Sequence, residues 1–312
     1  MSRASAATRQ LGTFLGLLGL CLALSLLTPH FLSVSNLLNV MEQTTINAVI
    51  ALGMTCVILT AGIDLSVGSL VALSGVALAS ALQAGLPAWL AVLVGLLVGA
   101  AGGLVNGALI TLGRLPPFIA TLGMMSVARG LALVYTAGRP ISGFEAGFRS
   151  LSTGRPLGIP APILITLGVY AVGHLALTRT RFGRYVYAIG GNEEATRLSG
   201  VAVRFHKAMV YLLSGAASGL AAALLTARLN SAQPIAGIMY ELDAIAATVI
   251  GGTSLMGGSG SLPGTLIGAL IMGVLRNGLN LLGVSSFLQQ IVIGVVIIVA
   301  VLVDAALKSE KK

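Results

Sequence analysis

The sequence is poor in charged side chains. Only 9% of its 312 residues are Asp, Glu, Lys or Arg, against about 25% in an ordinary soluble domain. A soluble fold of this length needs polar side chains over most of its surface, and 18 basic and 9 acidic residues cannot supply them. The composition therefore excludes a soluble enzyme, a nucleic-acid-binding module and a disordered chain.

Several chemical signatures are missing as well. The two cysteines, Cys21 and Cys56, lie in apolar runs and are interpreted as small core residues, and the three histidines lack metal-ligand spacing. No G-x-x-x-x-G-K-[ST] phosphate loop occurs, and no apolar segment carries a row of acidic residues suited to a proton or sodium relay. We therefore expect neither an enzyme nor a self-sufficient ion pump, and no metal or cofactor.

Apolar side chains make up 56% of the chain, and the mean hydropathy is +0.98. Windows of about 20 apolar residues predict an all-α polytopic membrane protein of about ten transmembrane helices, with broken or short helices near the pore. Eight spans plus re-entrant segments are the alternative. The ten segments are 11–28, 38–60, 65–83, 88–112, 117–136, 160–178, 207–228, 242–256, 264–283 and 286–304.

The distribution of basic residues predicts the orientation. Ten spans place both termini on one side, and with that side in the cytoplasm the inner segments hold most of the cations, as the positive-inside rule requires. These are Arg3, Arg9, Arg114, Arg179, Arg181, Arg184, Arg197, Arg204, Lys207, Lys308, Lys311 and Lys312. The outer loops hold only Arg139, Arg149, Arg155 and Arg228. The net charge of +9 is thereby explained without nucleic acid.

The chain reads as a single transmembrane domain, residues 1–312, with two hydrophilic loops. The loop 137–160 lies outside and the loop 179–207 faces the cytoplasm in the predicted orientation. The first apolar run is long for a signal peptide and no small-x-small cleavage site follows it, so we predict an uncleaved first span.

Neutral polar residues interrupt the apolar segments. We predict that Asn47, Asn106, Asn277 and Asn280 line or border a translocation path, because buried amides suit an uncharged polyhydroxylated solute better than an ion. Hydrogen bonding between helices is the alternative for each of them. Glu42 and Arg129, also in apolar segments, are candidates to pair with each other.

The cytoplasmic loop contains a predicted two-turn helix from Glu193 to Ser199. Asn192 is a good N-cap, Glu193 and Glu194 complement the positive end of the helix dipole, and Gly200 can end the helix. An element of this kind is either an amphipathic lid on the bilayer or a docking helix for a cytoplasmic partner.

Six segments together resemble the permease subunits of bacterial sugar ABC importers. They cover residues 40–304 in order. They are Ala61-Gly-Ile-Asp-Leu-Ser-Val-Gly-Ser69, Pro117-Phe-Ile-Ala-Thr-Leu-Gly-Met124, Gly183-Arg-Tyr-Val-Tyr-Ala-Ile-Gly-Gly-Asn192, Tyr240-Glu-Leu-Asp-Ala-Ile-Ala-Ala247, Gly251-Gly-Thr-Ser-Leu255 and Asn277-Gly-Leu-Asn-Leu-Leu-Gly-Val-Ser285. Within the family the likeness is greatest to ribose permeases, through Ala195-Thr-Arg-Leu-Ser-Gly200 and Ser231-Ala-Gln-Pro234.

The resemblance implies a homodimeric permease in the bacterial inner membrane. It implies a cytoplasmic ABC ATPase, a periplasmic or lipid-anchored sugar-binding protein and surrounding membrane lipid as partners. The segment that couples to the ATPase then contains Asn192, Glu193, Glu194, Ala195, Arg197, Leu198 and Gly200. We further expect some of Arg139, Arg149, Arg155 and Arg228 to contact acidic residues of the binding protein.

Other functions remain open on the sequence. A permease for a different pentose or hexose, or for a branched-chain amino acid, is the nearest alternative. A secondary transporter or facilitator predicts transport by this chain alone. An integral-membrane enzyme needs a paired acid, base or metal site at bilayer depth, and the sequence shows none.

Overall fold

The computed structural model describes the backbone of residues 3–309 and the side chains of residues 11–302. Five of the basic residues assigned to the inner side have side chains outside this range, namely Arg3, Arg9, Lys308, Lys311 and Lys312. The structure is helical apart from one two-stranded antiparallel ladder, in which β1 (Ile141–Ser142) pairs with β2 (Ser231–Ala232).

Helices occupy all ten predicted segments. They are α1 (Arg3–Leu27), α2 (Val34–Leu59), α3 (Val67–Gln83), α4 (Ala88–Thr111), α5 (Pro117–Thr136), α7 (Ala161–Arg179), α10 (Val203–Leu229), α11 (Tyr240–Ile250), α12 (Leu262–Leu281) and α13 (Ser286–Ser309). The two hydrophilic loops add the short helices α6 (Ala146–Thr153), α8 (Arg181–Gly191) and α9 (Glu193–Leu198), with the 3₁₀ turn η1 (Pro156–Gly158).

Six of these helices are long and apolar enough to cross a membrane within the described residues, namely α2, α4, α5, α7, α10 and α12. Shorter apolar stretches lie in α1, α3 and α13. The fold is therefore that of a polytopic helical membrane protein, while the count of ten spans stays a prediction. Helix α11 has 11 residues and rises about 16 Å, half of the bilayer core.

Helix α2 forms the centre of the molecule. Its residues from Val49 to Ala51 and from Val57 to Leu59 are completely buried, and α7, α10, α11 and α12 pack around it. Small residues bring α4 against α10, as their spacing of four predicts. Gly99, Gly103 and Gly107 approach the backbone of α10 so closely that a side chain at any of them would clash.

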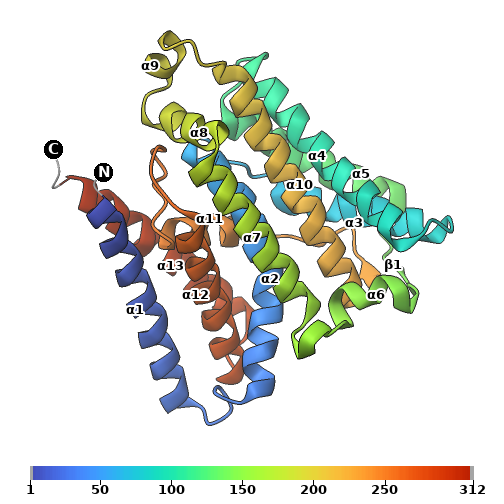
Figure 1. The fold of residues 1–312 in the computed structure, drawn as a ribbon. Helices are drawn as coiled ribbons and strands as arrows, with labels where there is room; N and C mark the ends of the chain where they lie inside the picture. The colour runs from blue at the N-terminus through green and yellow to red at the C-terminus, as the bar shows by residue number, and fades with distance from the viewer. Residues whose placement is uncertain (1–2, 310–312) are drawn as a thin grey trace.

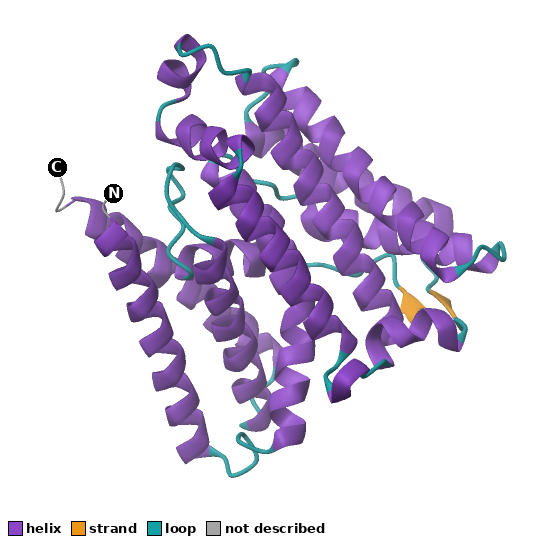
Figure 2. Ribbon diagram, in the orientation of Figure 1, coloured by secondary structure: helices purple, strands orange, loops and turns teal. Residues whose placement is uncertain are grey.

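The two ends of the molecule differ in the elements they carry (Figure 1). We call the end with α8, α9 and the α4–α5 turn the inner end; α1 begins and α13 finishes on this same side. We call the opposite end, with the α1–α2 turn, α6 and the strands, the outer end. Figure 2 shows the strand pair beside α6 there. These names follow the orientation predicted from the basic residues.

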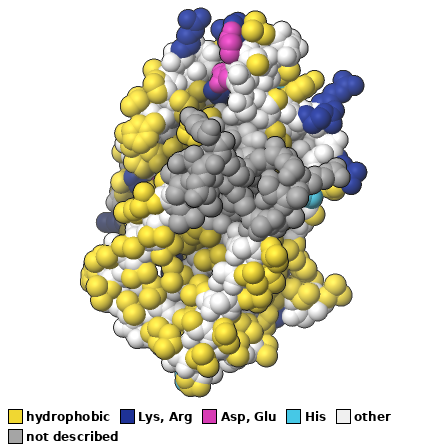
Figure 3. All heavy atoms as spheres, turned by 90° about the vertical axis from the view of Figure 1, so that its left-hand side faces the viewer, with side chains coloured by type: hydrophobic (Ala, Val, Ile, Leu, Met, Phe, Trp, Pro, Cys, Tyr) yellow, Lys and Arg dark blue, Asp and Glu magenta, His cyan; other side chains and the backbone are white. Residues whose placement is uncertain are grey.

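Hydrophobic and basic side chains on the surface are also separated along the axis from the inner to the outer end. Figure 3 shows hydrophobic side chains over the lower half of one face, while Lys and Arg side chains gather toward its upper end. Exposed large apolar residues run along α5 and α13, for example Val134 and Phe287, each 82% exposed. Such faces require lipid or another protein chain to cover them.

Candidate transport path and docking surfaces

Helix α9 is a capped two-turn element, as predicted. The side chain of Asn192 accepts a hydrogen bond from the backbone N–H of Ala195 at 2.9 Å, which is N-cap geometry. Gly200 follows the C-cap Ser199 with a left-handed φ of +81°, a conformation that glycine adopts without strain. The helix therefore begins at the predicted residue, Glu193, and ends at Leu198, one residue before the predicted end.

One ion pair connects α9 to α10 and a second lies within α9. Glu193 pairs with Lys207 of α10 at 3.0 Å, and Glu194 accepts a hydrogen bond from Nε of Arg197 at 3.0 Å. The hydrogen bond from Arg197 holds the pKa of Glu194 below its usual value. Thr196 is buried against the protein, whereas Leu198 is 76% exposed. Helix α9 thus exposes an apolar side chain at the inner end.

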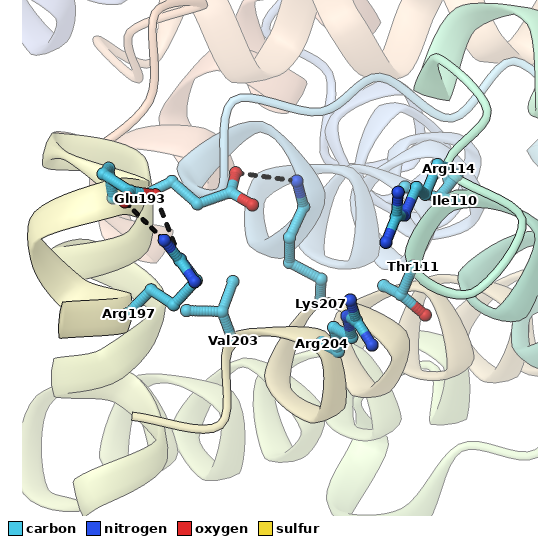
Figure 4. Close-up of a pocket in the computed structure, with 9 residues that line it drawn as sticks. Ile110, Thr111, Arg114, Glu193, Arg197, Val203, Arg204 and Lys207 are labelled. Carbon is cyan, nitrogen blue, oxygen red and sulfur yellow. Dashed lines mark hydrogen bonds and ion pairs between the residues drawn. The ribbon is translucent and has the colours of Figure 1, made fainter. Parts of the chain in front are cut away.

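A cavity of about 480 Å³ lies between α9, the start of α10 and the end of α4 (Figure 4). Its acidic residues are both engaged in the ion pairs just described. Arg114 and Arg204 also line it and have no acidic partner among the described residues. The inner end therefore offers positive charge beside the exposed Leu198.

Helix α8 joins the 179–207 loop at the inner end to the centre of the molecule. The hydroxyl of Tyr187 donates a hydrogen bond to the carbonyl of Gly260 at 2.9 Å. Gly190 lies so close to the carbonyl of Leu59 and the backbone of Gly258 that a side chain there would clash, and Gly258 N–H donates to Leu59 at 3.0 Å. Helix α8 thus contacts both the end of α2 and the loop that leads into α12.

The four arginines assigned to the outer side lie toward the outer end. Arg139, Arg149 and Arg155 are exposed, and Arg155 approaches Glu42 of α2 at 3.9 Å. Arg228, near the end of α10, is half-buried and lines a different cavity with Asn47 and Arg276. The first three are therefore available at the surface, whereas Arg228 belongs to the interior of the outer half.

The suggested pairing of Glu42 with Arg129 is wrong. Arg129 of α5 donates through Nη1 to the carbonyls of Pro234 and Ala236, at 2.7 and 2.6 Å. It therefore binds the irregular segment before α11, whose backbone has no helical partners of its own at this point. Spacing along the sequence could not show which helix faces α5.

The four asparagines that we predicted to line a translocation path have different surroundings. Asn47 lines the outer cavity and donates to Asp243 at 3.3 Å. Asn106 is fully buried and donates to Ser66 at 2.8 Å. Asn277 exchanges two hydrogen bonds with Asn36, and Asn280 accepts one from Gln289. Their role in a path stays a prediction, and Asn47 is the one beside an open cavity.

A buried carboxylate that residue-level reasoning overlooked sits between α2 and α3. Asp64 is completely buried, and its two oxygens accept hydrogen bonds from the hydroxyls of Ser66, at 2.6 Å, and Ser214, at 2.8 Å. With Asn106 bonded to Ser66, this network links the α2–α3 loop to α4 and α10. In the sequence, a single acidic residue between two apolar segments could have pointed to this buried site.

A second overlooked group is the ion pair of Asp243 with Arg276. One guanidinium nitrogen, Nη2, donates to both carboxylate oxygens, at 2.8 and 2.6 Å. Opposite charges in two separate apolar segments were the signal for this pair, because each is costly in a membrane without the other. The described residues contain no group of three or more His, Cys, Asp or Glu that could hold a metal ion.

Comparison with known proteins gives consistent matches. The family model described as "Branched-chain amino acid transport system / permease component" matches residues 36–301. The ribose import permease protein of Haemophilus influenzae is 52% identical over 303 residues, which cover 96% of this chain and 94% of that protein. The ribose import permease protein of Escherichia coli K12 is 53% identical over 296 residues, 94% of this chain and 92% of that protein.

A more distant relative is the D-allose transport system permease protein of Escherichia coli K12. It is 41% identical over 281 residues, which cover 90% of this chain and 86% of that protein. No solved structure matches the chain significantly.

Proposed function

Because the chain belongs to the family of branched-chain amino acid transport system permease components, we propose that it is the membrane-spanning subunit of an ATP-binding-cassette importer that carries ribose into the cytoplasm. The observation that supports this most is the identity of 52–53% with ribose import permeases over almost the whole chain. The described helices, six of them long enough to cross a bilayer, fit that role.

The energy for transport comes from a partner. The chain has no phosphate-binding loop of its own, so a cytoplasmic ATPase supplies the hydrolysis and the chain itself acts as a transport subunit. Residues Asn192–Gly200 form its docking element, since α9 is rigidly capped and its Leu198 is exposed. Movement of α9 reaches α2 and α12 through α8, which contacts the end of α2 and the loop that leads into α12.

The assembly is a homodimer with a sugar-binding protein on the outer side. The exposed apolar residues of α5 and α13 offer faces for a second copy or lipid. Both termini are cytoplasmic in the bacterial inner membrane, because the described basic residues at the inner end outnumber those at the outer end. Residues 1–312 act as one permease domain.

The test is reconstitution in proteoliposomes with the cognate ATPase and binding protein. We expect ATP-dependent uptake of labelled ribose, and none when the ATPase is omitted or its ATP site is inactivated. Uptake by the permease alone would instead establish a facilitator. D-allose, galactose and leucine are run in parallel, and a preference for leucine would contradict the assignment to sugars.

A further inference from the structure

A polar cavity lies in the outer half of the molecule between α2, α10, α11 and α12. Its volume is about 320 Å³, at the lower end of the range of about 300–1,000 Å³ typical of small-molecule sites. The polar side chains that line it are Gln43, Thr44, Asn47, Arg228, Tyr240 and Arg276. Asp243 does not line the cavity itself, but it accepts hydrogen bonds from Asn47 and Arg276, which do.

Asp243 fixes the geometry of this cavity. Its side chain is 2% exposed, while that of Arg276 is 38% exposed, so the ion pair reaches from the interior toward the open space. The two oxygens of Asp243 accept from Nη2 of Arg276, and Oδ2 also accepts from the amide of Asn47. Because both neighbours are anchored to one carboxylate, their remaining polar groups are held in place.

Those remaining groups are not satisfied by the protein. The Oδ1 atom of Asn47 is buried without a hydrogen-bond partner among the described residues. Arg276 uses a single guanidinium nitrogen, Nη2, in its hydrogen bonds to Asp243, which leaves Nη1 and Nε as donors. The donors of Arg276 are available to a solute in the cavity because this side chain is partly exposed, whereas Oδ1 of Asn47 has almost no exposed surface.

The free groups suit a polyol. Each hydroxyl of a sugar both donates and accepts, so neighbouring hydroxyls can accept from Arg276 or Arg228 and donate to the amide oxygen of Gln43. Asp243 neutralises the charge of Arg276, and Arg228 remains as a cation that donates to an oxygen-rich solute. Apolar neighbours such as Leu225 and Met272 complete the lining and suit the C–H face of a sugar ring.

We propose that this cavity is a binding subsite for a monosaccharide on its way into the permease. The inference rests on the proposed function and adds to it the place where the solute first meets this chain. Binding there is weak, since Arg276 stays partly open to water and its hydrogen bonds exchange with solvent. Weak binding is what transport needs, because a tightly held solute is not released.

The experiment measures protection of a cysteine by sugar in the reconstituted permease–ATPase complex. In a Cys21→Ala, Cys56→Ala background, Gln43→Cys reports on the cavity and Gln83→Cys, exposed at the same end outside it, is the matched control. A small water-soluble methanethiosulfonate is the reagent. Ribose is supplied at high concentration without the binding protein, so that no docked protein shields either site.

We expect ribose to slow the labelling of Gln43→Cys several-fold and to leave Gln83→Cys unchanged. Leucine at the same concentration should protect neither. Equal labelling with and without ribose, or protection by leucine alone, overturns the subsite. Wild-type ribose uptake is measured separately, so failure of the proposed function is distinguished from failure of the subsite.

The double variant Asp243→Asn, Arg276→Gln tests the role of the ion pair without leaving a buried charge. It is made in the Gln43→Cys background and checked for assembly with the ATPase. We expect ribose protection to be lost in the assembled complex, since the fixed donors are gone. Undiminished protection shows that the ion pair does not form the subsite and overturns that part of the proposal.

Discussion

Leu198 is the residue on which the docking role of α9 can be tested most directly. It is 76% exposed at the end of α9 and directly follows Arg197, which pairs with Glu194. We predict that Leu198→Asp leaves the protein inserted and assembled as a permease but strongly reduces sugar-stimulated ATP hydrolysis. A charge at this point cannot enter an apolar groove without the cost of desolvation.

The control for Leu198 is Leu198→Met, which keeps an apolar side chain of similar size and should retain coupling. Measurement of ATPase activity and ribose uptake in the same proteoliposomes separates docking from catalysis. If Leu198→Asp complexes assemble and keep full coupled activity, α9 is a surface loop only.

Ser214 illustrates how a buried carboxylate depends on its hydroxyl partners. It is completely buried and donates to Asp64 at 2.8 Å. We predict that Ser214→Ala lowers the stability of the purified permease by about 1–3 kcal/mol, because Oδ2 of Asp64 loses its hydrogen bond from the Ser214 hydroxyl. Thermal unfolding in detergent measures the loss.

Ser150→Ala is the matched control for Ser214→Ala. Ser150 is exposed on α6 and donates only to the carbonyl of Gly147 in the same helix, so its removal should change the melting temperature little. Equal effects of the two substitutions would show that the Asp64 network contributes no special stability.

At the scale of elements, α8 is the connection between α9 at the inner end and the long helices. Gly190 and Gly191 are neighbours in α8. A Cβ atom added at Gly190 would meet the end of α2 and the loop that leads into α12, whereas one added at Gly191 would point into open space. We predict that Gly190→Ala displaces α8 and lowers ribose transported per ATP hydrolysed, because a Cβ at this position overlaps the carbonyl of Leu59.

Gly191→Ala is the control, since the space beside Gly191 is open. It should retain the wild-type ratio of transport to hydrolysis. A wild-type ratio in Gly190→Ala as well would indicate that motion reaches α2 by another route.

Helix α11 is short because both of its ends are irregular. Met239 and Gly252 have left-handed φ values of +72° and +88°, and Arg129 binds the carbonyls of the segment before it. Irregular backbone at membrane depth is tolerated where protein or water satisfies it. The broken helix therefore stands where a path for a polar solute is physically allowed.

At the scale of the whole molecule, the exposed arginines of the outer end are the candidates for steering a binding protein. We predict that Arg149→Glu raises the KM for loaded binding protein about two- to fivefold at low salt, in line with the modest value of exposed charge pairs. The effect should shrink as salt is added, because exposed charges are screened.

Arg149→Lys keeps the charge and should behave as wild type in the same uptake assay. An unchanged KM for Arg149→Glu at low ionic strength would indicate that this arginine faces lipid headgroups or solvent.

Much of the architecture follows from local sequence. The lengths of the apolar segments predict where each long helix lies, because hydrocarbon thickness and helical rise are fixed quantities. The cap of α9 is equally local, since Asn192 and Gly200 act on backbone groups only a few residues away. The family was also identified from motifs in their order along the chain.

The pairing of polar groups between helices was not available from the sequence. Asp64 meets Ser214, Asp243 meets Arg276 and Arg129 meets the carbonyl of Pro234 across separations that no periodicity encodes. The rotation of each helix about its axis decides these contacts, and that rotation is set by the packing of all neighbours together.

The sequence by itself therefore determined the class of molecule, the helices and the caps of α9, because composition, length and capping are properties of single segments. Tertiary structure alone decided which predicted polar residues face a cavity. Asn47 faces the outer cavity, whereas Asn106, predicted on the same grounds, is fully buried beside Ser66. A cavity exists only between helices, so its lining depends on how four separate segments pack against one another.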